Sequence, residues 1–345
     1  MRCLALTRAA LAQAAQALAS GQLVAFPTET VYGLGADALN PDAVNRIFLA
    51  KGRPADHPLI VHVASLQAAR RLASDWPKAA QVLAEAFWPG PLTLVVKRAA
   101  EVPLVVTGGQ DTVGLRWPAQ PTAQALLEAF AALGSGAVAA PSANRFGGIS
   151  PSQAQHVVAS LGAVLQPGDL ILDDGPCGVG IESTIVDCTV SPVRVLRPGG
   201  ISRAALQAAL DNGLLVDLVH GDAAQEVPRV SGSLASHYAP TTPLRMLSAP
   251  DLHQAVQALL LRPGSQRVLC WVRQLVPTHD PRVTQVLMPS RPEVLAQQLY
   301  ARLHEWDALG FDQLLVEAPA QGPEWEAVRD RLGRAAFGGA ASHTP

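Results

Sequence analysis

Residues 26–35 read FPTETVYGLG, and the motif KGRP follows at residues 51–54. The first stretch predicts a short apolar strand that ends in threonines and a glycine-rich turn. An Asn-Pro pair at 40–41 predicts a helix start, because asparagine caps helices and proline fits the first helical position, and the glycine of KGRP predicts the helix end. The helix would deliver Lys51 and Arg53 to the turn. Hydroxyls, backbone N–H groups and two cations around one cavity suit a bound phosphate or carboxylate.

Length and composition predict a two-domain globular protein. The chain has 345 residues, 49% of them hydrophobic and 16% charged, with a formal net charge of −2. This length favours two domains with large cores, and the charge gives no general attraction to nucleic acid, so a cationic site must be local. Four scattered cysteines without a C-x-x-C pair argue against structural zinc and disulfides, and favour the reducing cytoplasm. Residues 7–21 predict a retained amphipathic helix, and no run is long enough for a membrane span.

Short apolar strands alternate with amphipathic helices from residue 23 to about 197, which is typical of an α/β domain. Strands are predicted at 23–26, 59–63, 92–96, 112–117, 137–140, 170–172, 183–187 and 193–196, and then at 244–247, 268–272, 283–288 and 314–317. The second group alternates with helices at 251–261, 292–309 and 324–334, and predicts a small, mostly parallel sheet. We expect domains at 1–210 and 243–345, joined by a linker over 211–242.

The strand at 112–117 is the most informative for function. Its period of two places Thr112, Gly114 and Arg116 on one face, and apolar residues on the other. A glycine between a threonine and an arginine leaves room for a ligand against the backbone, with the guanidinium placed to grip a carboxylate or phosphate. The alternative is an edge strand whose glycine marks a bulge and whose arginine reaches solvent.

Other polar residues at strand and helix ends have two interpretations each. Lys51 in a last helical turn is favoured by the helix dipole, and Arg53 before a proline can be solvated. His57 lies in the same loop, while His62 interrupts an apolar strand, where a hydrogen-bonded core histidine is the common alternative. The motif PSAN at 141–144 leaves a strand end, which is typical of ligand contacts, although helix capping also explains it. P-loop, G-x-S-x-G and G-x-G-x-x-G signatures are missing.

Five motifs together resemble one family. They are PTETVYGL at 27–34, KGRP at 51–54, WPGPLT at 88–93, PSAN at 141–144 and ESTI at 182–185. They occur in the order found in YrdC-like threonylcarbamoyl-AMP synthases, which the chain resembles over about residues 7–205. HYAP at 237–240, followed by more α/β sequence, resembles the longer two-domain form. The resemblance implies an α/β fold: a YrdC-like twisted mixed sheet with flanking helices and a cationic concave cavity, plus a smaller Rossmann-like C-terminal domain.

The resemblance also implies an activity. Members of this family make threonylcarbamoyl-adenylate from L-threonine, bicarbonate or CO2, and ATP, and release pyrophosphate. This is the first step toward threonylcarbamoyl-adenosine beside the tRNA anticodon. It implies Mg²⁺ carried with ATP, no organic cofactor, no protein-bound metal, and a cytoplasmic location without a membrane partner. The product would pass to a tRNA threonylcarbamoyl transferase, and tRNA binding by this chain is not required.

The family's functional residues map onto this sequence. Lys51 and Arg53 would act in catalysis by offsetting charge on the phosphates. Nucleotide contacts map onto Lys51, Arg53, His57, Thr112, Ser142, Asn144, Ser150, Arg197, His237 and Tyr238. Threonine contacts map onto Thr30, His62, Arg116, the backbone of Ala140, and Ser183. Ser236 stands where the family is often basic, which is a departure.

The linker at 211–242 is expected to fold over the cavity and exclude water from a hydrolysable adenylate, with the C-terminal domain anchoring its far end. A plain tether is the alternative.

Two other functions compete with the synthase interpretation. A carbamoyl-transfer enzyme of hydrogenase maturation would carry zinc-binding Cys pairs and an acylphosphatase-like module, and neither is visible in the sequence. A non-catalytic RNA-binding module would show salt-dependent RNA binding without ATP turnover.

Overall fold

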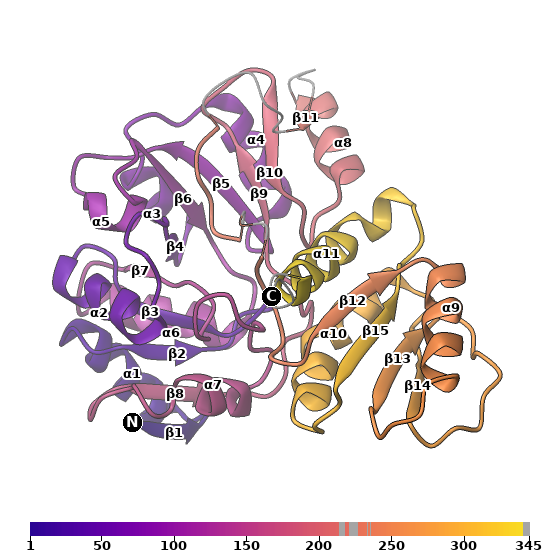
Figure 1. Cartoon of the computed structure of the whole chain (residues 1–345). Helices are drawn as coiled ribbons and strands as arrows, with labels where there is room; N and C mark the ends of the chain where they lie inside the picture. Colours follow the sequence, from indigo (N-terminus) through magenta and orange to yellow (C-terminus); the bar gives the residue numbers. More distant parts are fainter. Residues whose placement is uncertain (214–217, 221–226, 233, 235, 341–345) are drawn as a thin grey trace. The chain divides into compact units, whose positions relative to one another are not determined.

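The computed structural model describes residues 1–213, 218–220, 227–232, 234 and 236–340 (Figure 1). The chain divides into two compact units. The first comprises Met1–Phe146 and Ser150–Ser233, and the second comprises Gly147–Ile149 and Leu234–Pro345. The range 211–242 expected to be a linker contains helix and strand residues of the first unit, and the two units divide between residues 233 and 234.

The first unit is built on a mixed sheet. Its described strands are β1 (Arg2–Ala5), β2 (Val24–Phe26), β3 (Gly33–Asp37), β4 (Ile60–Val63), β5 (Leu92–Lys97), β6 (Thr112–Arg116), β7 (Ala137–Ala139), β8 (Leu170–Asp173), β9 (Thr184–Asp187), β10 (Val193–Arg197) and β11 (Leu218–His220). The strand order is β1-β8-β2-β3-β7-β4-β6-β5-β9-β10-β11, with parallel and antiparallel neighbours. The mixed sheet implied by the family resemblance is therefore confirmed.

Helices flank this sheet, as expected. They are α1 (Arg8–Ala19), α2 (Pro41–Lys51), α3 (Leu66–Arg71), α4 (Lys78–Phe87), α5 (Leu104–Thr107), α6 (Pro121–Ala131), α7 (Ala154–Leu161) and α8 (Arg203–Gly213). The predicted helix boundaries are confirmed where capping interactions are strong, as in α2. The Oδ1 atom of Asn40 accepts from the backbone N–H of Asp42 and Ala43, and Gly52 ends α2 in the left-handed region at φ 63°.

One part of the opening motif differs from its prediction. Gly33–Asp37 forms strand β3, antiparallel to β2, instead of continuing a glycine-rich turn. A Cβ added to Gly35 would lie 2.8 Å from the ring of Phe26 and 2.9 Å from the side chain of Val138. The glycine is therefore required for close packing within the sheet. Strands β1 and β11 were not predicted either; both are short and lie at the sheet edges.

The alternation of side chains along the strands determines on which face of the sheet a binding site can lie. On one face, the main core of the first unit includes Val61 of β4, Leu94 of β5, Leu115 of β6 and Val186 of β9. On the opposite face, α1 and α6 cover the part of the sheet formed by β2, β7 and β8 (Figure 1). That second core does not extend to β4, β6, β5 and β9. Their outward side chains are available for a binding site.

The second unit has a parallel sheet, as the sequence predicts. Its described elements are β12 (Leu244–Leu247), α9 (Ala249–Leu260), β13 (Val268–Val272), β14 (Val283–Leu287), α10 (Pro292–Asp307), β15 (Gln313–Glu317), a 3-10 turn at Pro323–Trp325 and α11 (Glu326–Ala340). The strand order is β12-β15-β13-β14, and each pair is parallel. Helices on both faces of a parallel sheet give the Rossmann-like architecture expected of this unit.

Candidate active site

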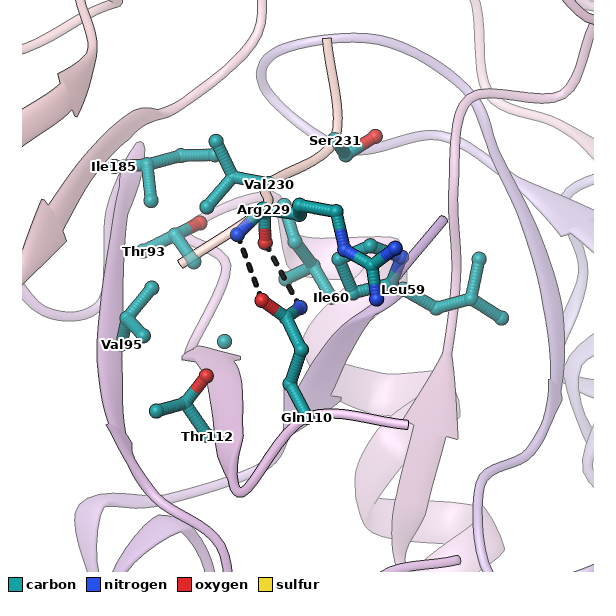
Figure 2. Close-up of a pocket in the computed structure, with 12 residues that line it drawn as sticks. Leu59, Ile60, Thr93, Val95, Gln110, Thr112, Ile185, Arg229, Val230 and Ser231 are labelled. Atoms are coloured by element: carbon teal, nitrogen blue, oxygen red, sulfur yellow. Dashed lines mark hydrogen bonds between the residues drawn. The ribbon is translucent and has the colours of Figure 1, made fainter. Parts of the chain in front are cut away.

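A pocket lies on the face of β4, β6, β5 and β9 that α1 and α6 leave uncovered, with about 300 Å³ of space when the part open to solvent is included. Figure 2 shows residues that line it. Thr112 and Gly114 of β6 line it, together with Thr93 and Val95 of β5. The alternation predicted for the strand at 112–117 is therefore confirmed. The edge-strand alternative is wrong, because β6 pairs with β4 on one side and with β5 on the other.

Arg116 is held at one end of this face by three groups. Its Nη2 lies 2.7 Å from Oε1 of Glu29 as an ion pair, its Nη1 donates to Oγ1 of Thr30 at 2.9 Å, and its Nε donates to the carbonyl of Gly90 at 3.3 Å. Only 4% of Arg116 is exposed. The guanidinium is therefore fixed in orientation before any ligand arrives, which is the condition for a selective carboxylate site.

His62 is paired in register with Arg116 across β4 and β6. It is 3% exposed, and burial, followed by the positive charge of Arg116, lowers the pKa of His62 to about 3. The imidazole is therefore neutral at pH 7. Ala140, one residue beyond β7, is tied to β4 by a hydrogen bond from its N–H to the carbonyl of Ile60 at 3.0 Å.

Arg53 and Arg197 converge on one residue, Ser231. The Nη1 of Arg197 donates to the carbonyl of Ser231 at 2.7 Å, and the Nη2 of Arg53 donates to its hydroxyl at 3.4 Å. Arg197 also donates to the carbonyl of Ser183 at 2.8 Å, and the Ser183 hydroxyl hydrogen-bonds that of Thr93 at 2.8 Å. The two expected cations therefore lie together, and Ser183 connects Arg197 to Thr93 in the lining of the pocket.

Residues 229–231 dock on the pocket of the first unit. The amide of Gln110 pairs with both polar backbone atoms of Arg229: its Nε2 donates to the carbonyl at 3.1 Å, and its Oε1 accepts from the N–H at 2.7 Å (Figure 2). Val230 is 7% exposed and packs on Val95 and Ile185. This part of the expected linker is therefore held against the pocket, while its opening and closing stay a prediction.

Lys51 does not have the surroundings expected from the sequence. It was expected to line the cavity outside the core, but it is 2% exposed, and its Nζ donates to the carbonyls of Ser142 at 2.6 Å and Asn144 at 2.5 Å. Burial, and then the charge of Arg53, hold the pKa of Lys51 well below its ordinary value. Arg53 is also buried, with its guanidinium 5.7 Å from the ring centre of Phe146. Lys51 therefore fixes the loop that carries Ser142 and Asn144.

Two further predicted nucleotide contacts have clear partners. The ring of His57 meets the ring of Phe146 edge-on at 5.3 Å, and burial, followed by the charge of Arg53, lowers the pKa of His57. The hydroxyl of Ser150 donates to Oε1 of Glu182 at 2.7 Å. His57 therefore packs on an aromatic ring, and Ser150 is bonded to a carboxylate, both within the first unit.

His237 and Tyr238 belong to the second unit. Tyr238 is 1% exposed, lies 5.2 Å from the guanidinium of Arg331 and 5.7 Å from the ring of Tyr300, and adopts a left-handed backbone with φ 63°. The ring of His237 stacks edge-on against Tyr238 at 4.1 Å. These contacts fix the far end of the linker to the second unit, as predicted. A nucleotide contact from either ring stays a prediction.

Sequence reasoning missed several residues of this site. Thr93 could have been found, because it alternates with the buried Leu92 and Leu94 as Thr112 does with Val113. Glu29 lies in the motif at residues 26–35, where the sequence pattern gives it no role. Gln110 lies in a loop with no periodic signal, and its partner Arg229 is 119 positions away.

No group of three or more His, Cys, Asp or Glu side chains that could hold a metal ion occurs among the described residues. No helix in the described part of the chain is long and apolar enough to cross a membrane.

Comparison with known proteins agrees with this geometry. The family model Sua5/YciO/YrdC, described as telomere recombination, matches residues 16–199, and a model described as threonylcarbamoyl-AMP synthase, C-terminal domain, matches residues 201–337. The threonylcarbamoyl-AMP synthase of Pyrococcus abyssi is 37% identical over 93% of this chain and 92% of its own length. That of Bacillus subtilis is 38% identical over 95% and 93%. The structure of P. abyssi Sua5 complexed with L-threonine superposes with a TM-score of 0.84, at 33% identity over 97% of both chains.

The mixed sheet, with a pocket on one face and buried arginines near it, is the fold of a YrdC-like domain, here joined to a Rossmann-like unit. With both family models and these full-length relatives, the chain belongs to the threonylcarbamoyl-AMP synthase family, in its two-domain form.

Proposed function

We propose that this chain forms threonylcarbamoyl-AMP from L-threonine, bicarbonate and ATP and releases pyrophosphate. Family membership supports this reaction. One observation assigns the reaction to residues of this chain: two pairs of side chains in the first unit are connected to each other. Arg116 with Thr30 offers a carboxylate site, Arg53 with Arg197 offers a phosphate site, and Ser183 contacts Arg197 directly.

The amino-acid end of the site would bind threonine by its carboxylate. Arg116 presents a planar fork whose orientation is already fixed, and Thr30 adds a hydroxyl beside it. Neither carboxylate oxygen of Glu29 accepts a hydrogen bond from any described residue, so Glu29 can accept from the threonine N–H or O–H. Neutral His62 beside Arg116 adds a polar ring without adding charge.

The phosphate end would bind ATP through Arg53 and Arg197. Both donate to Ser231 in this structure, and oxygens of the phosphates would replace the serine oxygens. The threonine amine adds to CO2, which forms when bicarbonate loses hydroxide; the amine proton combines with that hydroxide as water, and a carbamate remains. A carbamate oxygen then attacks the α-phosphorus, and the bond to pyrophosphate breaks. The two guanidinium groups offset the charge on the leaving pyrophosphate, and positioning supplies the rest. No side chain acts as a nucleophile.

Lys51 has a positioning part in this proposal. Its Nζ binds the carbonyls of Ser142 and Asn144, so it holds the loop that carries these two proposed nucleotide contacts. Thr112, His57 and Ser150 are proposed to complete the nucleotide site. The threonine site is completed by Ser183 and the backbone of Ala140.

We propose that Mg²⁺ accompanies ATP. Mg²⁺ in nucleotide sites is held by phosphates and waters with one or two carboxylates, which fits a unit whose described residues form no three-ligand cluster. Glu182, held by Ser150, is a carboxylate beside a proposed nucleotide contact. When bound, the ion would offset phosphate charge. A cytoplasmic location and transfer of the product to a tRNA threonylcarbamoyl transferase are proposed from the family.

Pyrophosphate release by the full chain tests this function. We expect release that requires both L-threonine and bicarbonate, and Arg53→Ala or Arg197→Ala should reduce it at least tenfold. Arg98→Ala is the matched control, because Arg98 is a half-buried arginine of the same unit whose partners, the carbonyl of Val102 and the carboxylate of Asp111, lie outside the pocket. Release that is independent of threonine, or RNA binding without release, would contradict the proposal.

A further inference from the structure

The parallel sheet of the second unit has a topological switch point between β12 and β15. Helix α9, which follows β12, packs through Leu252 and Val256 on the face of the sheet that carries Cys270 and Leu315. Helix α11, which follows β15, lies on the other face, where Gly333 approaches the side chain of Met246. Neighbouring strands β12 and β15 are thus followed by helices on opposite faces. Ligands of open α/β sheets bind at this point, outside the carboxyl ends of the strands.

A cavity occupies this place in the second unit. Its volume is about 810 Å³, including space open to solvent. Ala249 follows the end of β12, Glu317 ends β15, and Arg273 follows the end of β13, and all three line the cavity. The cavity therefore lies where the strand topology predicts a ligand, independently of the active site in the first unit.

The cavity contains one oriented cation. The carboxylate of Glu317, whose side chain is 7% exposed, accepts from the backbone N–H and from the Nε of Arg273, both at 2.7 Å. These bonds hold one edge of the guanidinium and leave its two Nη groups for another acceptor. The side chain of Arg273 is 49% exposed, so an incoming group can reach it. A guanidinium fixed in this way suits a carboxylate or a phosphate.

Part of the cavity lining is apolar. Leu252 of α9 and the loop residues Leu275 and Val276 contribute to it, beside the polar residues His253 and Gln274. The side-chain amide of Gln285 donates to the carbonyl of Val276 at 2.9 Å and accepts from its N–H at 2.7 Å, which fixes the loop. Leu275 is 59% exposed at the cavity, so apolar surface is available to a ligand.

We propose that this cavity binds a small molecule with an oxyanion, a carboxylate or a phosphate, on a partly apolar body. Arg273 binds the oxyanion and Leu275 covers the apolar part. A dinucleotide does not fit, because the turn from β12 into α9 reads Ser-Ala-Pro, without the glycines that let a pyrophosphate approach the backbone. The site adds a second ligand to the chain, beyond the proposed synthase reaction.

Calorimetric titration of the full-length chain tests this site. AMP, L-threonine and pyrophosphate are the probes, each titrated alone, since together they represent both oxyanion chemistries. We expect at least one probe to bind with two equivalents per chain, and Arg273→Gln to reduce this to one. Leu275→Asp should do the same while it leaves the Arg273 and Glu317 pair intact, which covers the case in which Arg273→Gln unfolds the unit. Arg245→Gln, at an exposed position of β12, should keep two equivalents.

The outcomes separate this proposal from the proposed function. An equivalent of bound probe that Arg53→Ala loses and Arg273→Gln keeps would be bound by the first unit alone. The second site would be overturned if no probe gave an equivalent that both Arg273→Gln and Leu275→Asp remove. If the synthase proposal alone were wrong, the equivalent that depends on Arg273 would still be present. The probe that gives the second equivalent distinguishes a phosphate ligand from an amino-acid carboxylate.

Discussion

The guanidinium of Arg116 lies 2.7 Å from the carboxylate of Glu29, and both side chains are largely buried, at 4% and 13% exposure. The contact is an ion pair in which neither Glu29 oxygen accepts a hydrogen bond from the described residues. Burying a carboxylate with unfilled acceptor sites costs free energy unless a ligand fills them. The pair places an acceptor beside a donor, which is the arrangement that the proposed binding of a zwitterionic amino acid requires.

Replacement of Arg116 tests the carboxylate site. Arg116→Lys keeps the charge but loses the planar fork, so we expect the KM for threonine to rise about tenfold, which corresponds to about 1.4 kcal/mol. Arg194→Lys is a matched control, because Arg194 is also buried and pairs with Asp187 at 2.9 Å outside the pocket. Steady-state kinetics with threonine as the varied substrate would decide, and an unchanged KM in Arg116→Lys contradicts the assignment.

Glu29 gives an independent test of the same site. Glu29→Gln removes the charge that orients Arg116 and replaces one acceptor oxygen by an amide NH2. Hydrogen bonds to charged groups contribute about 1.5–3 kcal/mol, so threonine binding should weaken by about tenfold or more. Glu101→Gln changes the same residue type at an exposed position and should have no effect. Threonine binding followed by calorimetry gives the comparison, and equal affinities for Glu29→Gln and the native chain would exclude this role.

Lys51 should contribute to stability as well as to activity. Lys51→Met leaves the carbonyls of Ser142 and Asn144 without their donor, and unpaired buried acceptors cost about 1–3 kcal/mol each. A loss of about 2 kcal/mol lowers the Tm of a unit this size by about 4–8 °C. Lys97→Met, at an exposed position, should change the Tm by much less. If Lys51→Met lost activity at an unchanged Tm, Lys51 would be a simple cavity-lining cation.

His62 should stay neutral throughout the physiological pH range. Its folded-state pKa of about 3 lies below its ordinary value of 6.5. As the pH falls below 6.5, the unfolded chain takes up a proton that the folded chain excludes. Stability that is fully present above pH 6.5 is therefore lost as the pH falls toward 3, by about 1.4 kcal/mol per pH unit. NMR titration of the ring protons tests this expectation, and a resonance of His62 that titrates near pH 6 would contradict it.

The sequence predicts the site where short-range rules apply. The period of two in β6 correctly assigns Thr112, Gly114 and Arg116 to one face, because alternation follows from strand geometry alone. The cap at Asn40 fixes the start of α2 for a similar reason. The interpretation of the glycines at 33 and 35 as a turn was wrong, because both lie in β3, where Ala140 packs close to Gly33 and Phe26 and Val138 pack close to Gly35.

The remaining parts depend on contacts that no local pattern encodes. Lys51 is a plausible surface residue at a helix C-terminus until the loop with Ser142 and Asn144 folds over it. Gln110 has no periodic or motif signal, and its significance comes from Arg229, which is distant in sequence. Such residues are identified only when the tertiary structure brings the two segments together.

Gln110 should control how firmly the linker is held on the pocket. Gln110→Ala removes both hydrogen bonds to the backbone of Arg229, each worth about 0.5–1.5 kcal/mol. The packing of Val230, the bond from Arg229 to the carbonyl of Gly108 and the arginine contacts to Ser231 remain. Trypsin cleaves after arginine, and cleavage after Arg229 requires the segment to leave the pocket. We therefore expect the cleavage rate at Arg229, measured by mass spectrometry, to rise about tenfold, as a loss of about 1.4 kcal/mol predicts.

The control for this experiment is Gln124→Ala, since Gln124 donates to the carbonyl of Pro118 in the same unit and should not affect cleavage at Arg229. Product lifetime links the contact to function. If residues 229–231 shield the adenylate, Gln110→Ala should also shorten the life of enzyme-bound threonylcarbamoyl-AMP. Faster cleavage with an unchanged product lifetime would show that Gln110 anchors the linker without making it a lid. Unchanged cleavage would show that Val230, the side-chain contacts of Arg229 and the arginine contacts to Ser231 hold the segment without Gln110.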